Sequence, residues 1–223
     1  MMNNEIIVPY LNAIEVMEDA DVLLYRGGNF PSFGWWIKKY TGGIHSHAAL
    51  YHKNSTPTVI EFREFKGSRM SSLQQHSNDT IDVFRLSQNY HNYIYSNEPW
   101  QVSLCNISGE DSGSCSILNN TTYLSKQIRQ DIVETAKSLT GLPYGWKIIG
   151  KIGLSYLPLV RLLYPQPKVD KNGNKDIFVC STFVSYCIRQ HYVDLVPFLP
   201  DILTKPSDLA RSPLLHYLFT IGF

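Results

Sequence analysis

The residue of this chain best suited to nucleophilic chemistry is a cysteine at the start of a predicted helix. Two apolar residues precede Cys180, and the apolar residues between Phe183 and Ile188 recur at three- and four-residue steps. This spacing predicts a helix with one buried face. Free backbone N–H groups and the helix dipole favour a thiolate over a thiol at such a position. Cys180 is therefore a candidate nucleophile, although a cysteine in an apolar stretch is more often a small buried side chain.

A thiol nucleophile needs a base, and the best candidate is a histidine far upstream. The segment Ile44–His52 predicts a strand, and alternate side chains of a strand share a face. His45 and His47 therefore lie on one face, together with Ala49 and Tyr51. We expect His47 to meet Cys180 in space. His45 is expected to contact the substrate, and it is also the alternative base.

A carboxylate on the next strand can orient this base. The turn Asn54–Pro57 predicts a hairpin into a second strand, Thr58–Phe62. Glu61 lies between two apolar residues and so faces away from them, where it can hold His47 in the required tautomer. An ordinary solvent-facing role is the alternative, and Glu64 is then the reserve candidate.

Further elements must position these side chains. Gln127–Leu139 has helical spacing and ends at Gly141 and Pro143. Ser68–His76 is expected to be a loop or a short helix, and a second short helix is expected to begin near Ser207. Two more segments have the apolar pattern of strands: Asp21–Tyr25 and Thr80–Leu86.

An aromatic cluster lies between the first strand and the histidines, in the segment Phe30–Tyr40. Trp36 and Tyr40 stand at helical spacing there. Such a cluster is more often core than ligand site. We nevertheless expect one ring, that of Trp36, to face a cleft near His47 and contact the substrate.

Composition limits the class of protein. The 223 residues include 20 basic and 19 acidic side chains, so the chain lacks the basic surplus typical of nucleic-acid binding. The length suits a single domain over residues 1–223, with an insertion or long loop at 87–123. We expect no cofactor and no metal ion, because the two histidines lack the further ligands of a zinc site.

The first residues lack the pattern of a secretory signal, so a cytoplasmic location is expected. The apolar segment 148–164 is interrupted by Lys151, Pro158 and Arg161. This pattern predicts contact with a membrane surface at most, and not a membrane-spanning helix. Cys105 and Cys115 flank a polar loop and can pair only in an oxidising compartment.

Together these segments resemble the NlpC-type cysteine peptidase superfamily. The turn Gly141-Leu-Pro-Tyr144 and the helix start Cys180-Ser-Thr-Phe-Val184 are similar to its motifs. Here the histidine strand precedes the cysteine helix, an order that resembles the circularly permuted branch with the YiiX-like and lecithin:retinol acyltransferase-like proteins. The strand with Glu61 and the late stretch Pro206-Ser-Asp-Leu209 resemble the YiiX-like group in particular.

The resemblance implies an α+β, permuted papain-like fold, with a small antiparallel sheet packed against the helix of the cysteine. It also implies a Cys180–His47–Glu61 triad, with Tyr144 lining the cleft and the Cys180 N–H stabilising an oxyanion. The expected reaction is cleavage of an amide through an acyl-enzyme. The expected substrate is a peptide or another amide, and cell-wall peptides and lipid-linked amides are two candidate classes.

Two alternatives stay open at this point. The same site can serve a lipid acyltransferase or thioesterase. The apolar segment 148–164, which could contact lipid, suggests this alternative. The fold can also be an inactive binding module, in which residues 87–123 cover the cleft. The Asn-Cys-Glu-His pattern of the acyltransferases is absent, which favours a hydrolase.

Overall fold

We describe a computed structural model of the chain. The structure describes residues 5–26, 38, 42–86, 93–95, 102–104, 126–145, 179–191, 193–197, 199, 201 and 204–223. Trp36, Cys105, Cys115 and the segment 148–164 lie outside the described residues, as does most of the predicted insertion at 87–123. Predictions on these residues therefore stay predictions.

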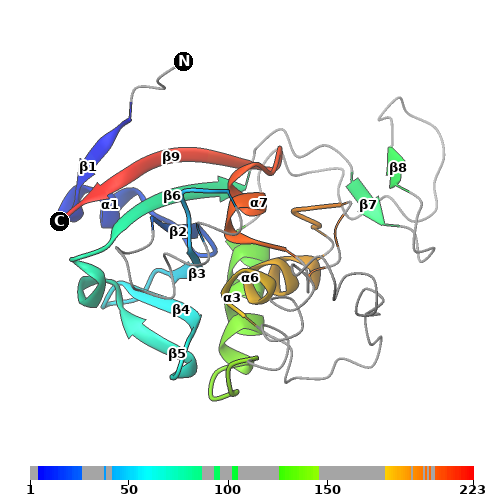
Figure 1. The fold of residues 1–223 in the computed structure, drawn as a ribbon, viewed down its shortest axis with the longest axis horizontal. Coiled ribbons are helices and arrows are strands. Elements are labelled where there is room, and N and C mark those ends of the chain that lie inside the picture. Colours follow the sequence, from blue (N-terminus) through cyan, green and yellow to red (C-terminus); the bar gives the residue numbers. More distant parts are fainter. Residues whose placement is uncertain are drawn as a thin grey trace, which may run out of the picture.

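The fold is α+β and is built on one seven-stranded, mostly antiparallel sheet (Figure 1). Its strands follow the order β1-β9-β6-β2-β3-β4-β5, in which only the β1–β9 pair at one edge is parallel. The strands are β1 (Ile7–Pro9), β2 (Val22–Arg26), β3 (His47–His52), β4 (Thr58–Arg63), β5 (Gly67–Ser72), β6 (Thr80–Leu86) and β9 (Leu215–Gly222).

Helices cover both faces of this sheet. The helix α1 (Tyr10–Val16) packs on one face, and α3 (Lys126–Ser138) and α6 (Cys180–Arg189) pack on the other (Figure 1). The short helix α7 (Pro206–Ala210) lies against α6 and β9. Because both faces are covered, the central strand β2 is a continuous run of buried apolar residues without alternation.

Successive side chains of β3 and β4 point to opposite faces of the sheet, and so contribute to two separate hydrophobic cores. Ala48, Leu50 and Phe62 face α3 and α6, whereas Ala49 and Tyr51 face α1. The rings of Phe62 and Phe183 lie 5.0 Å apart between centroids, at 48°. A ring pair of this kind adds about 0.5–1.5 kcal/mol beyond its burial, which helps to hold α6 on the sheet.

The strands and helices that the sequence predicts around the histidine and the cysteine are present. The strands expected at Asp21–Tyr25, Thr58–Phe62 and Thr80–Leu86 are β2, β4 and β6, and Ile44–His52 contains β3. The helices expected at Gln127–Leu139, at Cys180 and near Ser207 are α3, α6 and α7.

Two expectations were wrong. The sheet is not small, because the C-terminal strand β9 pairs with β6 and extends the sheet to β1. The segment Ser68–His76 is neither a loop nor simply a short helix: β5 runs to Ser72, and a 3₁₀ turn follows at Leu73–His76. Its serines and single methionine give little strand signal, so pairing with β4 decides its conformation.

The remaining strands form a separate pair within residues 87–123. β7 (Tyr93–Tyr95) and β8 (Val102–Leu104) are antiparallel. Among the described residues, no helix has the length and apolar character needed to cross a membrane.

Close backbone contact joins β5 to the turn after α3. The N–H of Ser68 donates to the Leu142 carbonyl at 2.8 Å, and the N–H of Gly141 donates to the Ser68 carbonyl at 3.0 Å. Gly67 has φ +70, and a Cβ built on it would lie 2.4 Å from the Leu142 oxygen. A glycine is therefore required here, and the contact fixes the segment that carries Tyr144.

We expect Gly67→Ala to lower the free energy of unfolding by more than 1–3 kcal/mol, roughly the cost of a strained backbone conformation, because a clash with Leu142 is added to the positive φ. Gly42→Ala is the matched control: its φ is +66, but nothing lies within 4 Å of an added Cβ. Urea unfolding of both variants measures the difference, and equal losses would contradict a close-contact role for Gly67.

Candidate active site

His47 and Glu61 form a buried hydrogen-bonded pair. His47 is the first residue of β3, and Glu61 lies on the neighbouring strand β4. The His47 Nε2 atom is 2.7 Å from the Glu61 Oε2 atom, and Glu61 is 0% exposed. The alternation expected from the sequence thus places this carboxylate on the face of the histidine.

Basic and hydroxyl groups hold the other oxygen of this carboxylate. Arg69 on β5 donates to Glu61 Oε1 from Nε at 2.9 Å and from Nη2 at 2.7 Å. The Ser71 hydroxyl lies 3.5 Å from the same oxygen, and His76 Nε2 lies 3.8 Å away. Glu61 is therefore fixed by partners on its own sheet before any substrate is bound.

Arg69, Ser71 and His76 were not predicted from the sequence as partners of Glu61. Arg69 is the direct cross-strand neighbour of Glu61, and Ser71 shares its face two residues on. If Ser68–Ser72 had been predicted as a strand paired with β4, Arg69 and Ser71 would have been expected beside Glu61.

Cys180 reaches the same histidine from the start of α6. The Cys180 side chain lies beside the His47 ring and raises the pKa of that ring, and Cys180 interacts with Tyr144 as well. Since His47 Nε2 faces Glu61, Nδ1 is the ring nitrogen left for the thiol. The structure thus brings together Cys180, His47, Glu61 and Tyr144 from four segments, and all four are buried.

The electrostatics of the pair favour its charged form. Burial opposes protonation of His47, but hydrogen bonds and charge interactions with Cys180 and Glu61 outweigh it and raise the pKa of His47 to about 10. Burial also disfavours the Glu61 carboxylate, yet His47, His76 and Arg63 hold the pKa of Glu61 well below its ordinary value. Glu61 is therefore an anion that stabilises an imidazolium.

His45 is not part of this arrangement, contrary to the expected shared face. β3 begins only at His47, and the His45 Nε2 atom lies 2.7 Å from Asp82 Oδ2 on β6. Arg26 and Thr220 donate to the same carboxylate. Residue 45 lies outside β3, so the alternation of side chains along that strand does not apply to it. The cluster of His45, Arg26 and Thr220 around Asp82 instead links β2, β6 and β9.

Of the other predicted site residues, Glu64 lies in the turn between β4 and β5 and does not replace Glu61 as partner of His47. Trp36 lies outside the described residues. In the part of the chain that the structure describes, no group of three His, Cys, Asp or Glu side chains is placed to hold a metal ion.

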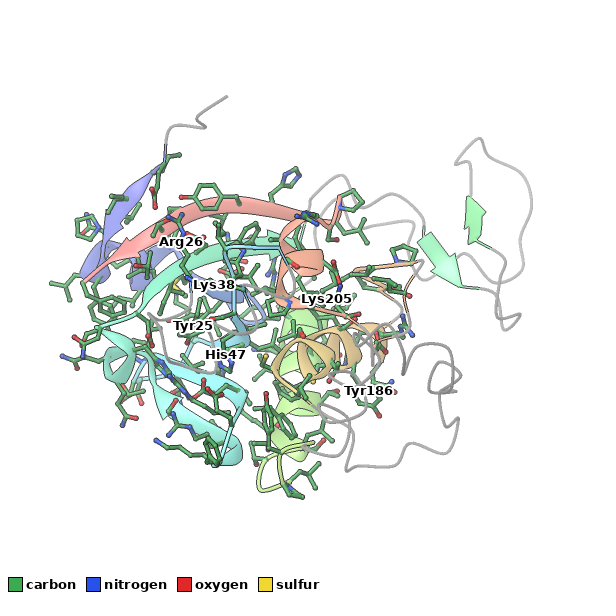
Figure 2. The ribbon with its side chains drawn as sticks, viewed as in Figure 1. Tyr25, Arg26, Lys38, His47, Tyr186 and Lys205 are labelled. Carbon is green, nitrogen blue, oxygen red and sulfur yellow. The ribbon has the colours of Figure 1, made fainter. Side chains whose placement is uncertain are left out.

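The ring of Tyr25 on β2 packs against the ring of His47, the candidate base. The rings of Tyr25 and His47 are 5.0 Å apart at 67°, and those of Tyr25 and His76 are 5.2 Å apart at 65°. Figure 2 shows Tyr25 and His47 next to each other. Within the described chain the Tyr25 hydroxyl is buried without a hydrogen-bond partner.

We expect Tyr25→Phe to raise the free energy of unfolding by about 1 kcal/mol, because it removes a buried unpartnered hydroxyl and keeps the ring on His47. Tyr25→Leu should instead destabilise the protein, since it removes the ring. Thermal unfolding of both variants tests this. Destabilisation by Tyr25→Phe would show that the hydroxyl has a stabilising partner.

A buried thiol, an imidazole and a carboxylate in series can carry out nucleophilic acyl transfer. The imidazole takes the thiol proton, and the carboxylate stabilises the imidazolium that results. The N–H groups at the start of α6 have no acceptors within the helix and can stabilise a developing oxyanion.

The fold and the site therefore define an α+β protein with a buried Cys–His–Glu cluster at a helix start. No model of a known protein family matches the chain, and a search of curated protein sequences finds no relative.

Proposed function

We propose that this protein is a thiol hydrolase that cleaves an amide bond. The observation that carries the proposal is that Glu61 hydrogen-bonds to His47 and that Cys180 lies beside the same ring and raises its pKa. Each member has the chemical character that its role requires: an anionic carboxylate, a readily protonated imidazole and a thiol at a helix start.

The reaction proceeds in two steps. His47 takes the proton of Cys180, and the thiolate forms a bond to the amide carbonyl carbon. The C–N bond then breaks, His47 gives its proton to the leaving amine, and a thioester remains on Cys180. In the second step His47 takes a proton from water, the hydroxide attacks the thioester, and the acid is released with the thiol restored.

A permuted papain-like arrangement is part of this proposal. In its support, the helix that begins with Cys180 packs on β3 and β4, the strands of His47 and Glu61. The histidine strand precedes the cysteine helix in the chain, as the sequence resemblance implies. The amide would belong to a peptide, and cell-wall stem peptides are the first class to test.

Tyr144 has a defined part in this scheme. Its hydroxyl hydrogen-bonds to Cys180, and burial together with the charges of Cys180 and Glu64 raises the pKa of Tyr144 well above its ordinary value. Tyr144 therefore stays a neutral donor, able to hydrogen-bond the sulfur or the carbonyl oxygen beside it.

The test is release of new amines from a panel of muropeptides and other peptide amides by the purified chain. We expect turnover by the wild type and loss of at least about 1,000-fold in Cys180→Ala and His47→Ala, as for removal of a nucleophile or a general base. Asp19→Asn, which loses a histidine–carboxylate bond at the far end of β3, is the control and should stay active. Turnover that survives in Cys180→Ala would refute the thiol mechanism.

A further inference from the structure

Two buried hydroxyl groups near the start of α6 lack hydrogen-bond partners. Thr204 and Ser207 are each 3% exposed, and in the described structure neither side-chain oxygen has a partner. A buried hydroxyl without a partner lowers the stability of the folded state. Two such groups three residues apart therefore require an explanation.

Both residues lie between the two segments that carry the thiol and its base. The Ser181 hydroxyl, next to Cys180, donates to the Thr204 carbonyl at 2.6 Å. On the other side, Ser207 packs on Gly43, four residues before His47: a Cβ built on Gly43 would lie 2.4 Å from the Ser207 Cβ. Figure 2 labels Lys205, which follows Thr204, above α6.

The chemistry of the surroundings favours an acceptor with negative charge. The two hydroxyls can donate, and so can the N–H groups of the first turn of α6, which have no acceptor within the helix. Two carboxylates close in the sequence already have partners: Asp208 accepts from the Lys205 N–H, and Asp201 accepts from Ser185 and pairs with Arg189. Among the described residues, the hydroxyls of Thr204 and Ser207 therefore have no acceptor.

We propose that Thr204 and Ser207 form a subsite that binds a carboxylate of the substrate beside Cys180. The inference rests on the proposed function, and it narrows the substrates to amides that carry a free carboxylate close to the scissile bond. A peptide cleaved next to its C-terminal residue or next to an acidic side chain has this chemistry.

A packing role for Ser207 makes a different prediction. The Ser207 Cβ occupies the space that a side chain at Gly43 would need, and alanine keeps the same Cβ in that place. Ser207→Ala should therefore keep or raise the melting temperature under either explanation. Only the subsite predicts that carboxylate binding is lost at the same time.

The first experiment measures binding without catalysis. In the full-length Cys180→Ala protein, N-acetylglycine at up to about 50 mM should raise the melting temperature, as for any ligand that binds the folded state. N-acetylglycinamide, which lacks the carboxylate, should not. Adding Ser207→Ala or Thr204→Val should weaken the apparent affinity at least about 5-fold, whereas Ser138→Ala, on the exposed end of α3, should leave it unchanged. Equal stabilisation by acid and amide, or no effect of either substitution, would overturn the subsite.

The second experiment separates failure of the subsite from failure of the proposed function. Iodoacetate and iodoacetamide both form a C–S bond with Cys180 and release iodide, while the thiol proton passes to His47. We expect iodoacetate to be favoured in the wild type, and the preference to fall at least about 5-fold in Ser207→Ala. An unchanged preference refutes the subsite alone. If Cys180 reacts with neither reagent, the proposed function is refuted. The melting temperatures measured with N-acetylglycine and N-acetylglycinamide then show whether the carboxylate subsite exists.

Discussion

At pH 6, His47→Ala is expected to slow alkylation of Cys180 by iodoacetamide by about 100-fold. An ordinary cysteine thiol, with a pKa of about 8.5, is ionised to only roughly 0.3% at this pH, and only the thiolate reacts. In the wild type His47 lies beside the sulfur and accepts the thiol proton readily, because Cys180 and Glu61 raise the pKa of His47 to about 10. Without His47 that partner is lost.

The rate is measured from pH 5 to 9 by mass spectrometry of the labelled peptide, which separates Cys180 from the buried Cys187 in the same helix. Asp19→Asn is again the control, since its carboxylate pairs with His52 and not with His47. Identical pH profiles in wild type and His47→Ala would show that the two groups do not act together, and the hydrolase proposal would fall.

Glu61→Gln is expected to lower the free energy of unfolding by about 3 kcal/mol. Removal of one partner from a buried ion pair costs about 3–5 kcal/mol, and we expect the lower end because the Arg69 side chain is 26% exposed. For a chain of this size the loss corresponds to a decrease of roughly 6–12 °C in melting temperature. Alkylation of Cys180 should slow as well, since the imidazolium loses its counter-charge.

The pair of His47 and Glu61 should also make the stability of the fold depend on pH. The pKa of His47 is raised from 6.5 to about 10, so its contribution is complete below pH 6.5 and is lost as the pH rises towards 10. The pKa of Glu61 is lowered from 4.5, so its contribution is complete above pH 4.5 and is lost in acid. The pair therefore stabilises the fold most between about pH 4.5 and 6.5.

Melting temperatures of wild type and Glu61→Gln, followed from pH 4.5 to 10, test this dependence. The wild type should lose its advantage over Glu61→Gln as the pH rises above 6.5. A constant difference up to pH 10 would mean that His47 is not held protonated by Glu61.

Much of the local structure can be predicted from the chain alone, because periodicity and turn residues are local. Helical spacing after Cys180 and alternation around Glu61 predict a thiol at a helix start and a carboxylate on the face opposite its apolar neighbours Ile60 and Phe62. Both features are present. Where the local signal is weak, as in the serine-rich β5, the prediction was wrong, and so Arg69 was missed as the partner of Glu61.

The sequence by itself determined the chemical types available and the elements that carry them: a thiol, two histidines and a carboxylate on a helix and two strands. Only the tertiary structure decided which of these groups meet. His47 pairs with Glu61 while His45 pairs with Asp82, because the start of β3 and the order of its neighbouring strands are set by long-range pairing and not by residue type. Likewise, the packing of α6 on β3 and of the residue 139–142 turn on β5 brings Cys180 and Tyr144 to His47, and no local pattern in the chain encodes that contact.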